Sequence, residues 1–279
     1  MNGQDVYPSH QMHSGSGQTS SQLLDPIPHL TVSPARPIIR YSNYAGRELE
    51  SMHFAMKYRQ WILDVFRPFL GKRIVEVGAG AGSFSELLLG TRPEWLFAVE
   101  PSTNMYPLLA KRLRDIHPGH RGSAHQGTLI DSIESIRQTG APDSVIYVNV
   151  LEHIEDDVQE LRTIHSLLQP GGHALIFAPA HPWLMGSIDH QFGHFRRYTR
   201  SELAEKCRDA GFTVRLSSYF DMLGIAPWWL RYCVLRSRTM DPFLVRLYDR
   251  YAVSLSRFLE SVVSPPMGKN VILVAEKGK

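Results

Sequence analysis

Residues 73–84 read Arg73-Ile-Val-Glu76-Val-Gly78-Ala79-Gly80-Ala-Gly82-Ser83-Phe84. A short β-branched run, typical of a buried strand, ends in three glycines at alternate positions, and Ser83 and Glu86 then stand at capping-box spacing. Glycines let the backbone approach a ligand and leave the N–H groups of the following helix facing it. The stretch therefore predicts a strand, a ligand-binding loop and a helix, which together form the first unit of an α/β fold.

The same pattern repeats along the chain. Short apolar runs predict strands at 73–77, 95–99, 144–149, 173–178, 213–219 and 270–276. Helical spacing predicts helices at 48–69, 84–89, 105–115, 130–137, 156–168 and 202–210. We expect Thr199 or Ser201 to cap the last of these helices and Gly211 to close it. Strands that alternate with helices form a parallel sheet with helices on both faces.

Length and composition fit one α/β domain with an insertion. The chain has 279 residues, of which 43% are hydrophobic, and this is enough for one sizeable core. We expect residues 1–36, rich in Gly, Ser, Gln and Pro, to form a disordered tail and residues 37–279 to form the domain. The 30 Lys and Arg against 27 Asp and Glu give no dense basic patch, so no nucleic-acid partner is expected.

Cysteine content and hydropathy predict a cytoplasmic protein. Cys207 and Cys233 offer neither a disulfide framework nor metal-ligand spacing, which suits a reducing compartment. The sequence shows no signal-peptide core and no uncharged apolar run of about 18 residues. Any membrane contact is therefore expected to be peripheral.

Two acidic residues flank the glycine loop. Glu76 precedes the loop, where it can meet a ligand ammonium. Glu100 ends the next predicted strand, where a carboxylate can accept hydrogen bonds from both hydroxyls of a ribose. The dinucleotide fingerprint G-x-G-x-x-G needs a glycine where this chain has Ser83. A NAD-dependent oxidoreductase stays an alternative, but a cationic amino-acid ligand fits the two carboxylates better.

Four motifs follow one another along the chain. They are Val75-Glu76-Val-Gly78-Ala-Gly80-Ala-Gly82, Val99-Glu100-Pro101-Ser102, Val148-Asn149-Val-Leu151-Glu152-His153-Ile154-Glu155 and Leu168-Gln-Pro170-Gly171-Gly172. As an ordered set they resemble the motifs of class I S-adenosylmethionine-dependent methyltransferases, in the small-molecule branch that includes the ubiquinone-biosynthesis O-methyltransferases. The resemblance implies a Rossmann-like, seven-stranded, mostly parallel sheet whose last strand is antiparallel.

The resemblance also implies the cofactor, S-adenosylmethionine, and the residues that hold it. The matched positions are Glu76, Gly78, Ala79, Gly80 and Gly82 around the methionine end, Glu100, Pro101 and Ser102 at the ribose, Gly127, Thr128 and Leu129 at the adenine, and Asn149, Val150 and Leu151 as the floor beside the sulfonium. At the adenine the acidic residue Asp131 is an alternative partner.

Candidate catalytic residues lie in two loops that follow predicted strands. His153 follows the strand 144–149, at the sheet edge where ligands bind, and is predicted to act as a base or to cap the next helix. The loop 179–198 supplies His181, Asp189, His190 and His194. The spacing of its three histidines matches no zinc pattern, so no metal is predicted.

The segment 221–266 interrupts the strand pattern before the last strand. One helical face carries Leu244, Leu247, Tyr248, Tyr251, Leu255, Phe258, Leu259 and Val262. Arg246, Arg250 and Arg257 fall off this face. Such helices suit a lid over an apolar substrate, a homodimer contact or a membrane surface, and packing on the core is a further alternative.

These observations predict an enzyme that transfers a methyl group from S-adenosylmethionine to a small or lipid- or glycolipid-like metabolite, at an oxygen. Methylation at nitrogen or carbon stays an alternative. So does a module that binds S-adenosylmethionine without turnover.

Overall fold

A computed structural model describes residues 55–116 and 121–279 of the chain. The predicted tail, residues 1–36, and the first part of the predicted helix 48–69 lie outside the described residues. The described part of that helix is α2 (Met56–Phe66), followed by a 3-10 turn (Arg67–Phe69).

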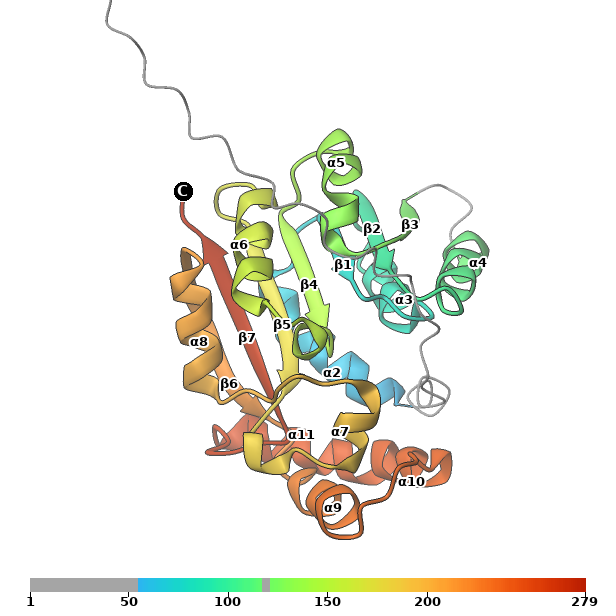
Figure 1. Cartoon of the computed structure of the whole chain (residues 1–279), viewed down its shortest axis with the longest axis vertical. Helices are drawn as coiled ribbons and strands as arrows, with labels where there is room; N and C mark the ends of the chain where they lie inside the picture. The colour runs from blue at the N-terminus through green and yellow to red at the C-terminus, as the bar shows by residue number, and fades with distance from the viewer. Residues whose placement is uncertain (1–54, 117–120) are drawn as a thin grey trace, which may run out of the picture. The chain divides into compact units, whose positions relative to one another are not determined.

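Within the described residues, seven strands form one sheet in the order β3-β2-β1-β4-β5-β7-β6 (Figure 1). They are β1 (Arg73–Val77), β2 (Trp95–Glu100), β3 (Gly122–Gln126), β4 (Ser144–Val148), β5 (His173–Pro179), β6 (Phe212–Phe220) and β7 (Asn270–Lys277). Strands β1 to β5 pair in parallel, and β7 is antiparallel to both β5 and β6. The expected seven-stranded sheet with an antiparallel last strand is confirmed.

One strand has no counterpart in the sequence pattern. β3 reads Gly-Ser-Ala-His-Gln, without a β-branched or large apolar residue, and it pairs only with β2. An edge strand with half-exposed faces needs little apolar content, so hydrophobic alternation could not reveal it.

Helices cover both faces of the sheet, which gives the core two halves. The helices are α2, α3 (Ser83–Gly90) and α4 (Tyr106–Ile116) on one face, and α5 (Leu129–Thr139), α6 (Asp157–Leu167) and α8 (Arg200–Asp209) on the other. Each helix packs its apolar side chains against the strands. Leu88 of α3 and Ile164 of α6, for example, are fully buried in opposite halves of the core. This burial of apolar surface is the main stabilising contribution.

The start of α3 differs from the predicted capping box. Gly82 is the N-cap residue, and its φ of +80° lies in the left-handed region. A Cβ on Gly82 would lie 2.9 Å from Leu109 Cδ1, so the position demands glycine for both reasons. Ser83 does not cap the helix, and its hydroxyl accepts a hydrogen bond from Arg112 (2.8 Å). At α8 the expected cap is confirmed, since Thr199 Oγ1 accepts the Glu202 N–H.

The insertion consists of short helices at the carboxyl end of the parallel strands. They are α9 (Ile225–Trp228), a π-helical turn (Trp229–Val234), α10 (Pro242–Leu247), a second π-helical turn (Tyr248–Ala252) and α11 (Val253–Val262). With α7 (Ser187–Phe192) they gather below the sheet in Figure 1. In the described part of the chain, no helix is both long and apolar enough to span a bilayer.

Buried Asp249 ties the insertion to the N-terminus of α2. Its two carboxylate oxygens accept the backbone N–H groups of Lys57 (3.1 Å) and Tyr58 (2.9 Å). The N-cap residue of α2, Ala55, has no side chain that can do this. A negative charge also interacts favourably with the N-terminal end of the helix dipole.

Replacing Asp249 by Ala is expected to lower the free energy of unfolding by about 1–3 kcal/mol, because two buried N–H groups lose their acceptor. Urea unfolding measures the change. Asp115→Ala is the control, since its exposed carboxylate lies 4.0 Å from Lys111 and such pairs contribute little. Equal losses in the two variants would contradict the capping role.

Candidate active site at the carboxyl edge of the sheet

The glycine loop after β1 is held by its neighbours. Gly78 and Gly80 have φ of +68° and +55°. The Ala79 N–H donates to the Val99 carbonyl (3.0 Å), and the Gly80 N–H donates to the Glu100 carboxylate (2.7 Å). A Cβ on Gly78 would lie 2.4 Å from Val150 Cγ2, so Gly78 is needed where this loop meets the loop after β4.

Glu100 forms hydrogen bonds with the glycine loop, with the segment after β2 and with the segment before α5. Its carboxylate is buried and accepts N–H groups from Gly80 and from Ser102 (2.8 Å), beyond Pro101. Its backbone carbonyl accepts the N–H of Gly127 (3.2 Å). A carboxylate has about four lone-pair sites, so two sites stay open to ribose hydroxyls.

Glu76 is a buried carboxyl group at the end of β1. Its carboxyl group accepts a hydrogen bond from the Ser85 hydroxyl. Burial raises the pKa of Glu76 to about 8, against the opposing effect of that hydrogen bond, and the charge of Glu100 adds to the rise. Glu76 is therefore mostly uncharged at pH 7 and would ionise beside a cation.

The segment predicted to contact adenine begins α5. Thr128 is its N-cap and forms a capping box with Asp131: the Asp131 carboxylate accepts the Thr128 N–H (2.9 Å), and Thr128 Oγ1 accepts the Asp131 N–H (3.4 Å). Asp131 therefore stabilises the start of α5. Gly127 and Leu129 are buried beside it, and their predicted cofactor role stays a prediction.

The loop after β4 forms the centre of the site. Asn149 has a φ of +55°, and its N–H donates to the Phe177 carbonyl of β5 (2.8 Å). Val150 packs beside Gly78, and Leu151 is fully buried. The segments predicted to hold the cofactor therefore all meet at the carboxyl edge of the parallel strands.

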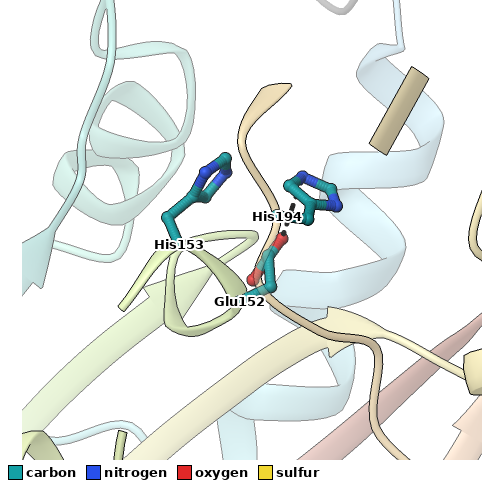
Figure 2. Close-up of side chains that lie close together, drawn as sticks. All are labelled: Glu152, His153 and His194. Carbon is teal, nitrogen blue, oxygen red and sulfur yellow. Dashed lines mark ion pairs between the residues drawn. The ribbon is translucent and has the colours of Figure 1, made fainter. Parts of the chain in front are cut away.

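Three side chains converge where this loop meets the loop 179–198: Glu152, His153 and His194 (Figure 2). One ligand atom from each lies within 4.8 Å of the others, so the group has the donors and spacing to hold a metal ion. The rings of His153 and His194 are perpendicular, with centroids 4.6 Å apart. Burial lowers the pKa of His153 to about 4, and the charge of His194 adds to the lowering.

Glu152 is fully buried, and neither of its oxygens has a hydrogen-bond partner on another described residue. Burial raises its pKa to about 7, while the charges of His194 and Arg197 act in the opposite direction. His194 Nε2 lies 4.0 Å from Glu152 Oε1. A buried carboxyl group without a partner is costly and indicates a functional site.

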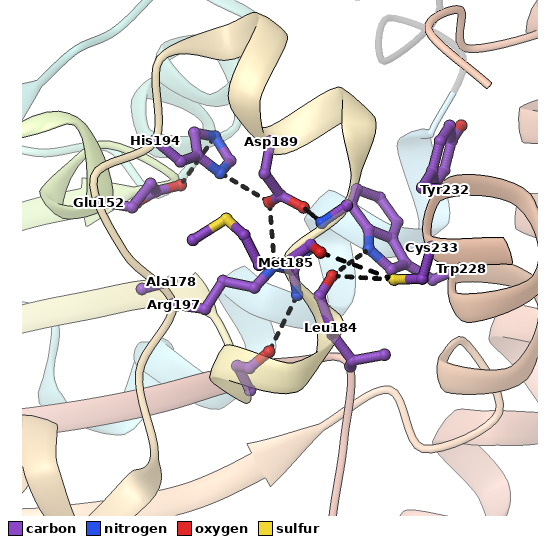
Figure 3. A network of polar contacts seen from close by, with 12 residues as sticks. Glu152, Ala178, Leu184, Met185, Asp189, His194, Arg197, Trp228, Tyr232 and Cys233 are labelled. Atoms are coloured by element: carbon purple, nitrogen blue, oxygen red, sulfur yellow. Dashed lines mark hydrogen bonds and ion pairs between the residues drawn. The ribbon is translucent and has the colours of Figure 1, made fainter. Parts of the chain in front are cut away.

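Asp189 orients His194 from the opposite side (Figure 3). Its carboxylate accepts His194 Nδ1 (2.8 Å), Arg197 Nε (2.9 Å) and the Gly186 N–H (2.8 Å). Burial alone would raise the pKa of Asp189, but the hydrogen bond from His194 and the charge of Arg197 hold it below its usual value. Arg197 also donates to the Ala180 carbonyl and lies over the Trp228 ring of α9, 4.8 Å from its centroid.

The structure separates the other predicted catalytic residues from this cluster. His190 is exposed on α7. His181 stacks on Tyr219 of β6, with centroids 4.5 Å apart, and its Nε2 has no hydrogen-bond partner among the described residues. Among the described residues, the metal-compatible group is Glu152, His153 and His194, and neither His181 nor His190 belongs to it.

Two further sequence expectations need correction or completion. His153 does not cap the following helix, because Asp156 is the N-cap of α6 and accepts the Gln159 N–H (3.0 Å). Glu152 and Arg197 were not among the predicted catalytic residues. Glu152 stands in the quoted third motif, next to His153, but only burial without a partner distinguishes it from a solvated acid.

Comparison with known proteins identifies the family. The family described as "Methyltransferase domain" matches residues 52–217. The chain belongs to this methyltransferase family. S-adenosylmethionine is its cofactor, and the dinucleotide alternative is set aside.

This methyltransferase is 24% identical over 181 residues to a ubiquinone biosynthesis O-methyltransferase of Marinobacter nauticus, covering 60% of this chain and 75% of that protein. A ubiquinone biosynthesis O-methyltransferase of Ralstonia nicotianae is 29% identical over 172 residues, covering 54% and 66%.

Solved structures share the fold of this methyltransferase. An S-adenosylmethionine-dependent methyltransferase from Mesorhizobium loti has a TM-score of 0.51 at 15% identity, covering 77% of this chain and 97% of that one. The [4+2]-cyclase SpnF has a TM-score of 0.53 at 16% identity, covering 80% and 81%. One fold thus carries different activities, so the acceptor chemistry must come from the site.

Gly78→Ala is expected to lower the affinity for S-adenosylhomocysteine at least tenfold, because the added Cβ meets Val150 and the residue has a positive φ. Adding Val150→Ala should recover part of the loss by removing the clash while the backbone strain remains. Isothermal titration measures both. Gly90→Ala, where a Cβ meets nothing within 4 Å, is the control; an unchanged affinity in Gly78→Ala would contradict the predicted role of the glycine loop in cofactor binding.

Binding of S-adenosylhomocysteine at pH 7 is expected to release close to one proton, because the ligand ammonium favours the ionised form of Glu76, whose pKa is about 8 without ligand. Affinity should rise as the pH rises from 6 to 8, while Glu76 is still protonated in the free protein, and level off above its pKa. Titration calorimetry in buffers of different ionisation enthalpy measures the proton release. Glu76→Gln should abolish it and exposed Glu94→Gln should not; proton release that persists in Glu76→Gln places the ammonium elsewhere.

Proposed function

We propose that this methyltransferase transfers the methyl group of S-adenosylmethionine to a hydroxyl oxygen of a small apolar or lipid-like metabolite. The observation that carries the proposal is the Asp189–His194 pair, which offers a proton acceptor next to Glu152 at the carboxyl edge of the sheet. A hydroxyl must lose its proton as its oxygen is methylated, so a positioned base accelerates the reaction. The relatives named ubiquinone biosynthesis O-methyltransferase support oxygen as the accepting atom.

We assign the base to His194 rather than to His153. With its Nδ1–H donating to Asp189, His194 keeps the lone pair of Nε2 for the acceptor hydroxyl. Asp189 also stabilises the imidazolium that forms when the proton arrives. His153, whose pKa is about 4, stays neutral at pH 7 and is a weaker base. Its ring, perpendicular to that of His194, would position the acceptor.

The residues at the carboxyl edge fit the cofactor. Glu76 is a buried carboxyl group that a ligand ammonium would ionise, and Glu100 keeps lone pairs for the ribose. When bound, S-adenosylmethionine supplies an electrophilic methyl group on its sulfonium. The protein's own contribution is to hold the acceptor in line with that bond and to exclude water.

A second route to the deprotonated acceptor uses the same three side chains. The unpartnered carboxylate of Glu152 beside two imidazoles is a donor set that divalent ions accept. An ion held there would lower the pKa of a ligated hydroxyl. Base catalysis and metal assistance differ in their response to chelators.

His194→Asn is expected to lower kcat by about 10²–10⁴-fold with an unchanged affinity for S-adenosylhomocysteine, because Asn can still donate to Asp189 but lacks the Nε2 base. Single-turnover transfer of a labelled methyl group to a panel of phenols, hydroxylated lipids and amines measures the rate. His190→Asn is the matched control, because His190 is exposed outside the cluster.

Three outcomes of this assay decide between the routes. Near wild-type rates in His194→Asn would show that no base at this position is needed. Loss of wild-type activity after dialysis against a chelator, with recovery on adding a divalent ion, favours metal assistance. Turnover confined to the amines of the panel would overturn oxygen as the accepting atom.

A further inference from the structure

The helical run 242–262 of the insertion turns its apolar stripe to the solvent. The stripe consists of residues spaced three or four apart along α10, the second π-helical turn and α11: Leu244, Leu247, Tyr251, Leu255, Phe258 and Val262. Their exposed fractions lie between 42% for Leu244 and 71% for Val262. The sequence alternative of packing this stripe on the core is therefore wrong; of the predicted apolar residues, Tyr248 is the one that reaches the core.

Polar residues hold the opposite side of the same run against the protein. Asp249 accepts the N–H groups of Lys57 and Tyr58, and Glu260 accepts those of Asp221 (3.2 Å) and Met222 (2.7 Å). Buried Ser256 donates to Glu260 (3.1 Å). Rotating the helix to bury its apolar stripe would break these bonds and leave the N–H groups without acceptors. The outward orientation of the stripe is thus fixed by buried hydrogen bonds.

The insertion carries a second exposed apolar group. Trp229, Leu230, Val234 and Leu235, in or next to the first π-helical turn, are between 47% and 69% exposed. Soluble proteins rarely expose so many large apolar side chains in one segment without a partner.

The exposed charge of the insertion is mostly positive. Residues 221–266 contain six arginines, no lysine and four acids. Of the acids, Asp221 and Asp249 are buried and Glu260 is partly buried, so Asp241 is the exposed one. Five of the arginines are exposed: Arg236, Arg238, Arg246, Arg250 and Arg257. Outward apolar residues beside outward arginines are the composition of a helix that lies in a membrane interface.

We propose that this insertion surface, defined by the apolar stripe and the exposed arginines of residues 229–262, docks on a lipid bilayer that carries anionic lipids. The 21-residue run is about 30 Å long, enough for its stripe to lie in the interface plane. The arginine stems can extend along the apolar boundary and bring their charges to lipid phosphates. A second copy of the chain fits less well, because a two-fold contact would set arginines against arginines.

The proposal does not depend on the accepting atom of the reaction, and it has a test without turnover. The full-length protein is sedimented with phosphatidylcholine vesicles that contain or lack about 30% phosphatidylglycerol. We expect binding to the anionic vesicles that weakens in about 0.5 M salt. The variant Leu247→Ser/Tyr251→Ser/Leu255→Ser should bind on the order of 100-fold more weakly, and Arg246→Gln/Arg250→Gln about 30-fold more weakly.

The matched control is Leu108→Ser/Ile130→Ser, which removes two equally exposed apolar side chains from α4 and α5. It should bind vesicles like the native protein. The affinity of each variant for S-adenosylhomocysteine reports whether the domain stays folded. If the stripe variant does not fold, the arginine variant still tests the proposal.

Native protein that stays in the supernatant, or variants that bind as well as the control, overturn the proposal. If the native protein sediments as a dimer in analytical ultracentrifugation and the stripe variant sediments as a monomer, the surface is an interface between two copies. If vesicles bind only after residues 1–54 are removed, that segment covers the stripe. Either result also overturns docking of the native chain on a bilayer.

Discussion

The carboxyl ends of the parallel strands β1, β2, β4 and β5 meet at one edge of the sheet, and the rest of this structure depends on that constraint. Each strand must be followed by a loop at this edge, because its chain returns through a helix. The loops then hold one another: Gly80 donates to Glu100, Asn149 donates to Phe177, and Gly78 leaves room for Val150. The residues predicted to hold the cofactor are thus positioned by contacts that exist without a ligand, which lowers the ordering that binding would require.

A buried charge extends this arrangement toward the insertion. Asp189 binds His194 on one side and Arg197 on the other, and Arg197 stacks on Trp228. In a buried site such a carboxylate is stable only while its partners stay in place. One network of contacts therefore orients the proposed base, His194, and holds Trp228 of α9 in place (Figure 3). The neighbouring Arg196 and Tyr198 add to it by binding Asp157 at the start of α6.

The insertion reverses the usual packing of an amphipathic helix. Its polar side is buried because Asp249 and Glu260 satisfy backbone N–H groups that otherwise have no acceptor. Lys269 strengthens the same contact: its ammonium lies 3.0 Å from Asp221 and over the rings of Tyr58, Trp228 and Tyr248. If the insertion docks on a bilayer as proposed, an apolar acceptor in that bilayer would lie close to the candidate site, because the insertion lies at the carboxyl end of the parallel strands.

The sequence by itself determined the α/β class, the six strands with apolar runs and the loops that hold the candidate site residues, because periodicity and glycine spacing are local properties. It missed β3, which lies at the sheet edge and needs no apolar pattern. It also misplaced the start of α3, because capping-box spacing does not reveal that Gly82, with its left-handed backbone, is the N-cap residue. Only the tertiary structure decided which histidine meets which acid. His181, His190 and His194 lie within 14 residues of each other, yet only His194 reaches Glu152 and His153, because α7 and the Asp189 network turn it toward the loop after β4. The spacing of the insertion stripe likewise left its direction undecided, since an apolar face predicts burial. The direction is set by backbone N–H groups that donate hydrogen bonds to Asp249 and Glu260, which are distant from them in sequence.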